Sequence, residues 1–64
     1  MIKVKVRGIK NPSKPLVDRI RDTEIKVNVD HIDYYCEGEY DNMLVFLHGD
    51  ILIIEKDEFK KLKI

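Results

Sequence analysis

The side chains best suited to metal chemistry in this 64-residue chain are His31, Cys36 and His48. Two imidazoles and a thiolate, completed by a carboxylate such as Asp33 or Asp50, form a donor set that zinc accepts. Their spacing argues against a site, because neither C-x-x-C nor H-x-x-x-H occurs. Cys36 also falls on an apolar row, where it would be a small core residue. We therefore predict no metal site and no cofactor.

The stretch Asp30-His31-Ile32-Asp33 has the other catalytic potential in the chain. On a strand, His31 and Asp33 would share a face, and a carboxylate there could orient an imidazole for general-base catalysis. Catalysis would also need a nucleophile or a concave pocket, and so small a domain has little interior to build one. We interpret the stretch as a solvated polar face and predict neither enzyme activity nor catalytic residues.

A basic segment, residues 10–23, is best suited to an anionic ligand. Arginine binds phosphate through two parallel hydrogen bonds, so the segment could clamp a nucleotide-type small molecule. We favour a solvated loop for this segment, with the anion clamp as the alternative. The candidate ligand-binding residues of this segment are Lys10, Lys14, Arg19 and Arg21.

Three tyrosines surround an acidic turn at residues 37–42. Tyr34 is expected in the core. Tyr35 and Tyr40 are expected to be exposed, and we add them to the candidate partner-binding residues because exposed tyrosines often anchor interfaces. The neighbouring acids would repel phosphates, so nucleic acid is not an expected partner.

The net charge of zero hides a strong asymmetry. Residues 1–21 carry seven basic side chains and one acid, residues 22–59 carry eleven acids and two bases, and residues 60–64 carry three lysines. Basic and acidic strands paired side by side would explain this pattern, and a bipolar docking surface is the alternative. Without an overall positive field, the chain lacks the usual signature of a nucleic-acid-binding protein.

Strands must position most of these side chains, because apolar and polar residues alternate along much of the chain. Residues 43–55 predict a central hairpin, in which two apolar runs flank His48-Gly49-Asp50. Further strands are expected at 2–9, 24–29 and 32–37.

The strand expected at 32–37 should carry Ile32, Tyr34 and Cys36 on the row that faces the core. Residues 57–63 predict a terminal helix with Asp57 as N-cap and with Phe59 and Leu62 on one face. The sequence therefore predicts one mostly β domain over residues 1–64. Its expected architecture is a small curled antiparallel sheet, or a partly open barrel, of about five strands with a short C-terminal α-helix.

Both faces of the predicted hairpin are apolar, and the rest of the chain offers enough apolar surface to cover only one of them. A two-fold partner would cover the other face, so we predict a homo-oligomer, a dimer or larger. The expected interface residues are Leu44, Phe46, Leu52, Ile54 and Phe59.

The single cysteine excludes an internal disulfide and is compatible with a reducing cytosol. No apolar run approaches the ~18 residues of a membrane span, and the alternating N-terminus differs from a signal peptide. The expected location is the cytoplasm.

Three stretches, MIKVKVRG, VNVDHIDYY and LVFLHGDILIIEKDEF, together resemble the FlbD/SwrD family of small flagellar-operon proteins and similar short phage and prophage proteins. The chain differs in its basic, two-proline segment 10–23, where the family is expected to make a short turn. The family has no established catalytic residues, so the resemblance implies binding rather than a reaction.

We therefore expect a non-enzymatic, phage- or prophage-like binding module that acts by protein–protein contact, as an inhibitor or adaptor of a host protein. One alternative is an oligomeric sponge for an anionic, nucleotide-type small molecule. Another is a flagellar accessory protein of FlbD type.

Overall fold

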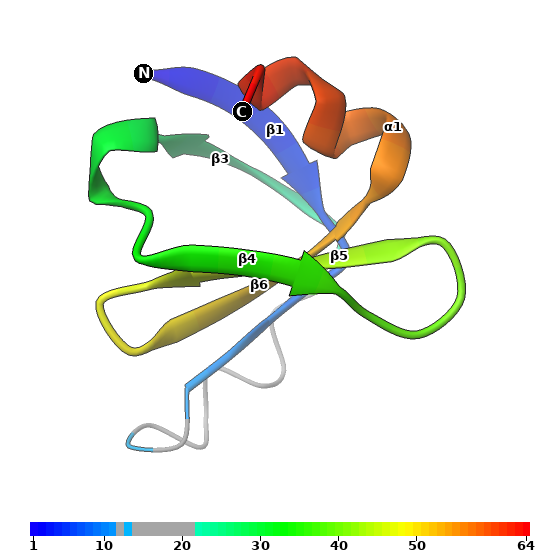
Figure 1. The fold of residues 1–64 in the computed structure, drawn as a ribbon, viewed down its shortest axis with the longest axis horizontal. Helices are drawn as coiled ribbons and strands as arrows, with labels where there is room; N and C mark the ends of the chain where they lie inside the picture. Colours follow the sequence, from blue (N-terminus) through cyan, green and yellow to red (C-terminus); the bar gives the residue numbers. More distant parts are fainter. Residues whose placement is uncertain (12, 14–21) are drawn as a thin grey trace.

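The computed structural model describes residues 1–11, 13 and 22–64 (Figure 1). Its strands are β1 (Ile2–Val6), β2 (Gly8–Lys10), β3 (Thr23–Val27), β4 (Tyr34–Glu37), β5 (Asn42–Leu47) and β6 (Asp50–Glu55). The helical elements are α1 (Lys56–Phe59) and two 3-10 turns, η2 (Val29–His31) and η3 (Lys60–Leu62). The prediction of a mostly β, antiparallel domain with a short C-terminal helix is confirmed.

The strands form two antiparallel sheets, one with the order β1-β3 and one with the order β2-β6-β5-β4. Neither sheet is closed or strongly curled, so two sheets replace the single curled sheet or barrel that the sequence suggested. The predicted first strand is divided at Arg7, whose N–H donates to the Ile53 carbonyl at 2.7 Å. Before Arg7 the chain pairs with β3, and after it the chain pairs with β6. The second part, β2, is the sixth strand.

The core lies between the two sheets. Figure 1 shows β1, β3 and α1 together on one side of the four-stranded sheet. The side chains that fill this space are almost completely buried: Val4, Val6, Val27, Val45, Leu52, Ile54 and Leu62. One face of the central hairpin is therefore covered by the first strands and the terminal helical segment together.

The turn of the central hairpin corrects the predicted faces. Leu47 pairs with Asp50, so the loop has two residues, His48 and Gly49, rather than three. Both have positive φ angles, 47° and 92°, as a tight turn between right-twisted strands requires. This register pairs Leu44 with Ile53, whereas a three-residue loop would pair Leu44 with Ile54.

The same register places Val45 opposite Leu52 and Met43 opposite Ile54. Leu52 and Ile54 are only 2% and 0% exposed, so they belong to the core. The prediction that they share an interface face with Leu44 and Phe46 is wrong, because the shorter turn shifts every residue of β6 to the other side of the sheet.

The inner row of β4 is also the reverse of the predicted one. Ile32 packs on the core, but Tyr34 is 59% exposed and Cys36 is exposed. The Asp33 N–H donates to the Phe46 carbonyl at 2.8 Å, and Phe46 is also the register partner of Tyr34. Two residues thus oppose one, as in a β-bulge, and the extra residue inverts the alternation after Ile32.

The terminal helix begins at Lys56, one residue earlier than predicted, and continues as η3 to Leu62. Asp57 lies inside its first turn and is not the N-cap; Glu55 precedes the helix without a side-chain cap hydrogen bond. The helix is instead held to β1 by Glu58, whose Oε1 accepts a hydrogen bond from the Lys5 N–H at 2.9 Å.

We expect this contact to make stability depend on pH. The hydrogen bond from Lys61 and then that from the Lys5 backbone lower the pKa of Glu58 from its ordinary value of 4.5. A carboxyl with a lowered pKa stabilises the fold above its ordinary pKa, and this stabilisation is lost as the pH falls through the folded-state pKa. Urea unfolding of the natural protein and of Glu58→Gln should therefore differ most at neutral pH and converge in acid. A difference that stays constant with pH would contradict this.

Candidate protein-binding surface on the four-stranded sheet

The side of the four-stranded sheet that faces away from the core is largely apolar. Because residues alternate along strands and directly opposed residues share a face, the register identifies its members. We call this surface the outer face; its apolar side chains are Tyr34, Cys36, Leu44, Phe46, Ile51 and Ile53. Lys10, opposite Ile51, continues it onto β2.

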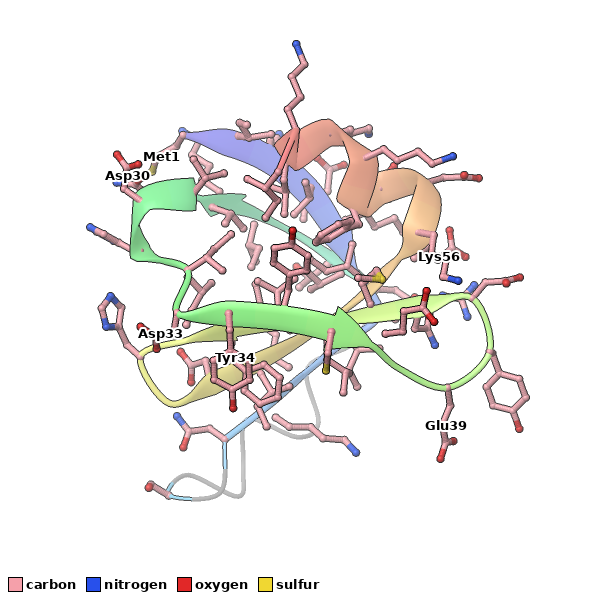
Figure 2. All side chains as sticks on the ribbon, viewed as in Figure 1. Met1, Asp30, Asp33, Tyr34, Glu39 and Lys56 are labelled. Atoms are coloured by element: carbon pink, nitrogen blue, oxygen red, sulfur yellow. The ribbon has the colours of Figure 1, made fainter. Side chains whose placement is uncertain are left out.

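An aromatic pair holds one edge of the outer face. The rings of Tyr34 and Phe46 stack with centroids 4.2 Å apart and planes 15° from parallel. Figure 2 shows the Tyr34 side chain pointing away from the side of the sheet that α1 occupies. Offset-stacked rings on neighbouring strands form a flat, rigid contact surface that loses little conformational entropy when a partner binds.

Within residues 1–11 and 22–64, no helix or strand lies over the outer face, because β1, β3 and the helical segment all pack on the opposite side. Phe59, predicted to belong to an interface, packs against the core and lies 5.1 Å from the ring of Tyr35. Tyr35 is 44% exposed but lies on the inner side of β4. Neither ring therefore belongs to the outer face.

A shallow hollow of about 350 Å³ lies at the end of the outer face nearest the β4–β5 turn. Its floor is apolar and its rim is polar; the lining residues are Lys10, Glu39, Tyr40, Asn42, Leu44 and Ile53. Tyr40 is 89% exposed, and its φ of 57° places it in the left-handed region of a tight turn. The Asn42 Oδ1 atom is buried and accepts no hydrogen bond from the described residues. The hollow therefore presents an ammonium and a phenol beside apolar side chains.

The structure brings together part of the predicted site. Lys10, Tyr40 and Leu44 meet at the hollow, and Phe46 lies one position along the same face. Lys14, Arg19 and Arg21 lie outside the described residues. Lys10 shares the hollow with Glu39, which opposes the field that an anionic ligand would need.

Tyr34 and Cys36 lie on the outer face although they were expected in the core, and two further members, Ile51 and Ile53, were missed by the sequence analysis. The signal that identifies them is the His48-Gly49 pair. When both residues are read as the complete loop, Leu47 pairs with Asp50, and Ile51 and Ile53 fall opposite Phe46 and Leu44.

The two histidines meet at the other end of the sheet. Their ring centroids lie 5.4 Å apart in an edge-on arrangement, and Asp33 Oδ2 accepts the His48 backbone N–H at 3.1 Å. The Asp33 carboxylate thus binds the hairpin turn instead of orienting an imidazole. Across the described residues, no three His, Cys, Asp or Glu side chains gather in a geometry that could hold a metal ion.

A second hollow, lined by Lys5, Arg7, Asp22, Glu55 and Glu58, is charged. Two bases and three acids line it, and Arg7 pairs directly with Glu55. Paired surface charges of this kind neutralise one another, so they offer neither an anion site nor a free general base.

We expect Cys36 to react in the folded protein, because its thiol is exposed on the outer face. An aromatic disulfide reagent should modify it completely under native conditions, at a rate within about tenfold of that in urea. Cys36→Ala should change the free energy of unfolding by less than about 1 kcal/mol, because no buried methylene is lost. Protection of the thiol until the protein unfolds would contradict the exposed position.

Comparison with protein-family models, with curated proteins and with solved structures finds no match to the chain. Among the described residues, no helix combines the length and the apolar character needed to cross a bilayer. The outer face is thus the feature of this chain that points to a function.

Proposed function

We propose that this protein is a non-enzymatic, cytoplasmic binding module that holds a partner protein on its outer face. The observation that supports the proposal is the stacked Tyr34–Phe46 pair, continued by apolar side chains and bordered by Lys10, Glu39 and Tyr40. An apolar centre with aromatic anchors and a polar rim is the composition of protein interfaces. An inhibitor or an adaptor can act through such a contact without any reaction.

Covering the outer face with a partner also removes apolar surface from water, which favours binding. Fully burying a large apolar side chain contributes roughly 1.5–3 kcal/mol, and a partner would gain part of this at each of the half-buried Leu44, Phe46, Ile51 and Ile53. Cys36 on this face carries a free thiol, which suits a reducing compartment. These features support binding by contact between protein surfaces.

The proposal can be tested with ligands selected from a display library of random peptides. The double variant Phe46→Thr/Ile51→Thr removes the centre of the outer face and keeps residues that favour strands. Its matched control, Glu24→Thr/Lys26→Thr, changes two exposed side chains of β3. We expect the dissociation constants of selected ligands to rise about 100-fold for the first variant and less than about twofold for the control. Equal binding to both variants would refute the proposal.

The homo-oligomer predicted from the sequence remains part of this proposal, with the outer face as the surface that supports it. Four strands of about five residues cover roughly 300 Å² in projection, less than the ~800 Å² per partner of a typical stable interface. We therefore expect weak, reversible association. Light scattering during size exclusion should give a mass that rises with concentration and a monomer for Phe46→Thr/Ile51→Thr. A monomer at every concentration of the natural protein would contradict self-association.

A further inference from the structure

Strand β4 forms one edge of the four-stranded sheet, and among the described strands it pairs only with β5. The Gly38 N–H donates to the Asn42 carbonyl at 2.9 Å, in line with the β4–β5 register. Because backbone groups alternate in direction along a strand, those of Tyr34 and Cys36 also point toward β5. The N–H and C=O groups of Tyr35 and Glu37 therefore point out of the sheet.

This edge has fewer of the features that usually prevent strand addition than the opposite edge, although a bulge at Asp33 precedes it. The opposite edge, β2, has only three residues, ends in Lys10 and is followed by Asn11 and a proline. Short strands, lysine and proline are the common means of blocking an edge. Strand β4 contains no lysine, proline or glycine, and all four of its residues are exposed.

The charges carried by β4 and the residues that flank it in sequence are all negative. Residues 30–41 contain five acids and neither lysine nor arginine. Of these acids, Glu37 has its Oε1 atom 3.8 Å from the Lys56 Nζ atom, and the Asp33 carboxylate accepts a hydrogen bond from the backbone N–H of His48. A second copy paired antiparallel at this edge would oppose acids to acids, which is destabilising. A strand with basic side chains would be attracted instead.

We propose that β4 accepts an extended segment of a partner protein as an additional strand, and that this segment alternates apolar and basic residues. The inference rests on the proposed protein-binding function and identifies its partner. Strand addition at a sheet edge is an established mode of peptide recognition, in which backbone bonds give affinity and alternate side chains give specificity.

The geometry determines where the apolar residues and the basic residues of the partner segment lie. Residues opposite Tyr34 and Cys36 extend the outer face, so they are apolar. Residues opposite Tyr35 and Glu37 lie on the other side of the sheet, so they are the basic ones. There a lysine or arginine lies beside the Glu37 carboxylate, which also pairs with Lys56, and beside the partly exposed Tyr35 ring. These basic residues also direct their own N–H and C=O groups at β4, because they oppose the residues whose backbone groups point outward.

The probe is a synthetic peptide of about eight residues that alternates lysine and valine, with blocked ends. We expect it to bind and to shift and protect the backbone amides of Tyr35 and Glu37 in NMR spectra of the labelled protein. A glutamate–valine peptide of the same length should bind at least tenfold more weakly. N-methylation of the lysine residues should abolish binding, whereas N-methylation of the valine residues should leave it within about threefold.

Two matched variants test the same contact from the protein side. Glu37→Pro and Glu37→Thr both remove the carboxylate, but only proline removes the outward N–H, and it is tolerated on an edge strand. We expect Glu37→Pro to lose binding of the lysine–valine peptide and Glu37→Thr to retain it within about fivefold. Circular dichroism establishes that each variant is folded.

Equal binding to the two variants, equal binding of the acidic peptide, or a dimer paired through β4 would overturn the inference. Absence of binding at millimolar peptide would overturn it as well. In that case the proposed function would still stand if display-selected ligands required Phe46 and Ile51, so the two failures can be told apart.

Discussion

Replacing Ile54 with alanine is expected to lower the free energy of unfolding by about 2–5 kcal/mol. Ile54 is 0% exposed and packs among the core residues between the two sheets. A domain of this size has roughly 5 kcal/mol to lose, so a large part of the Ile54→Ala protein should be unfolded at room temperature. Urea unfolding followed by circular dichroism measures the change.

The adjacent residue is the matched control. Ile53 lies on the outer face and is half-buried, so Ile53→Ala should cost less than about 1.5 kcal/mol. The two variants remove the same atoms from consecutive positions of one strand. A greater loss at Ile53 than at Ile54 would mean that the hairpin has the other register and that the outer face is misassigned.

Leu62→Ala is expected to have an effect of similar size, about 2–5 kcal/mol. Leu62 is 2% exposed and joins the core that contains Val4 and Val6, although it lies in the terminal 3-10 turn. Its loss should leave a cavity and release the turn that the Lys5–Glu58 contact holds on β1. Thermal unfolding should show a midpoint lower by ten degrees or more.

Ile64, 47% exposed and two residues further along, provides the control for Leu62. Ile64→Ala should change the free energy of unfolding by less than about 0.5 kcal/mol. Equal effects of the two substitutions would show that the terminal segment is held by general apolar contact and not by the insertion of Leu62 into the core.

Much of the fold could be predicted from alternation alone. The apolar residues of β1 and β3 recur with a period of two, and two short apolar runs flank the turn of the central hairpin, which identifies all of them as strands. Phe59 and Leu62 were also expected on one helix face, and both pack against the core. These elements follow from local pattern because burial on one face is what the pattern encodes.

The faces of two strands could not be predicted, because each depends on a single residue of backbone geometry. One loop residue more or less at His48-Gly49 inverts β6, and one bulged residue at Asp33 inverts β4. Alternation gives the two rows of a strand but does not say which row is inside. The outer face was therefore predicted with the right partners on β5 and the wrong ones on β6.

The division of the first strand was also beyond the sequence. Gly8 permits a bend, but the bend becomes a change of sheet only because β6 is positioned to accept the Arg7 N–H. Strand addition at β4 likewise depends on which backbone groups remain free, and that follows from register and not from residue type.

The transfer at Arg7 has a consequence for how the chain folds during its synthesis. Strand β2 pairs with β6, and Leu62 completes the core that β1 begins. At typical rates of translation, roughly 3–10 s separate the appearance of Lys10 from that of Leu62. Through this interval the valines of β1 lack the complete core, so the lysines that alternate with them protect a nascent β-forming segment from association with other chains. Replacing those lysines with threonine should thus greatly lower the yield of soluble protein from translation. The free energy of unfolding of the purified domain should change little.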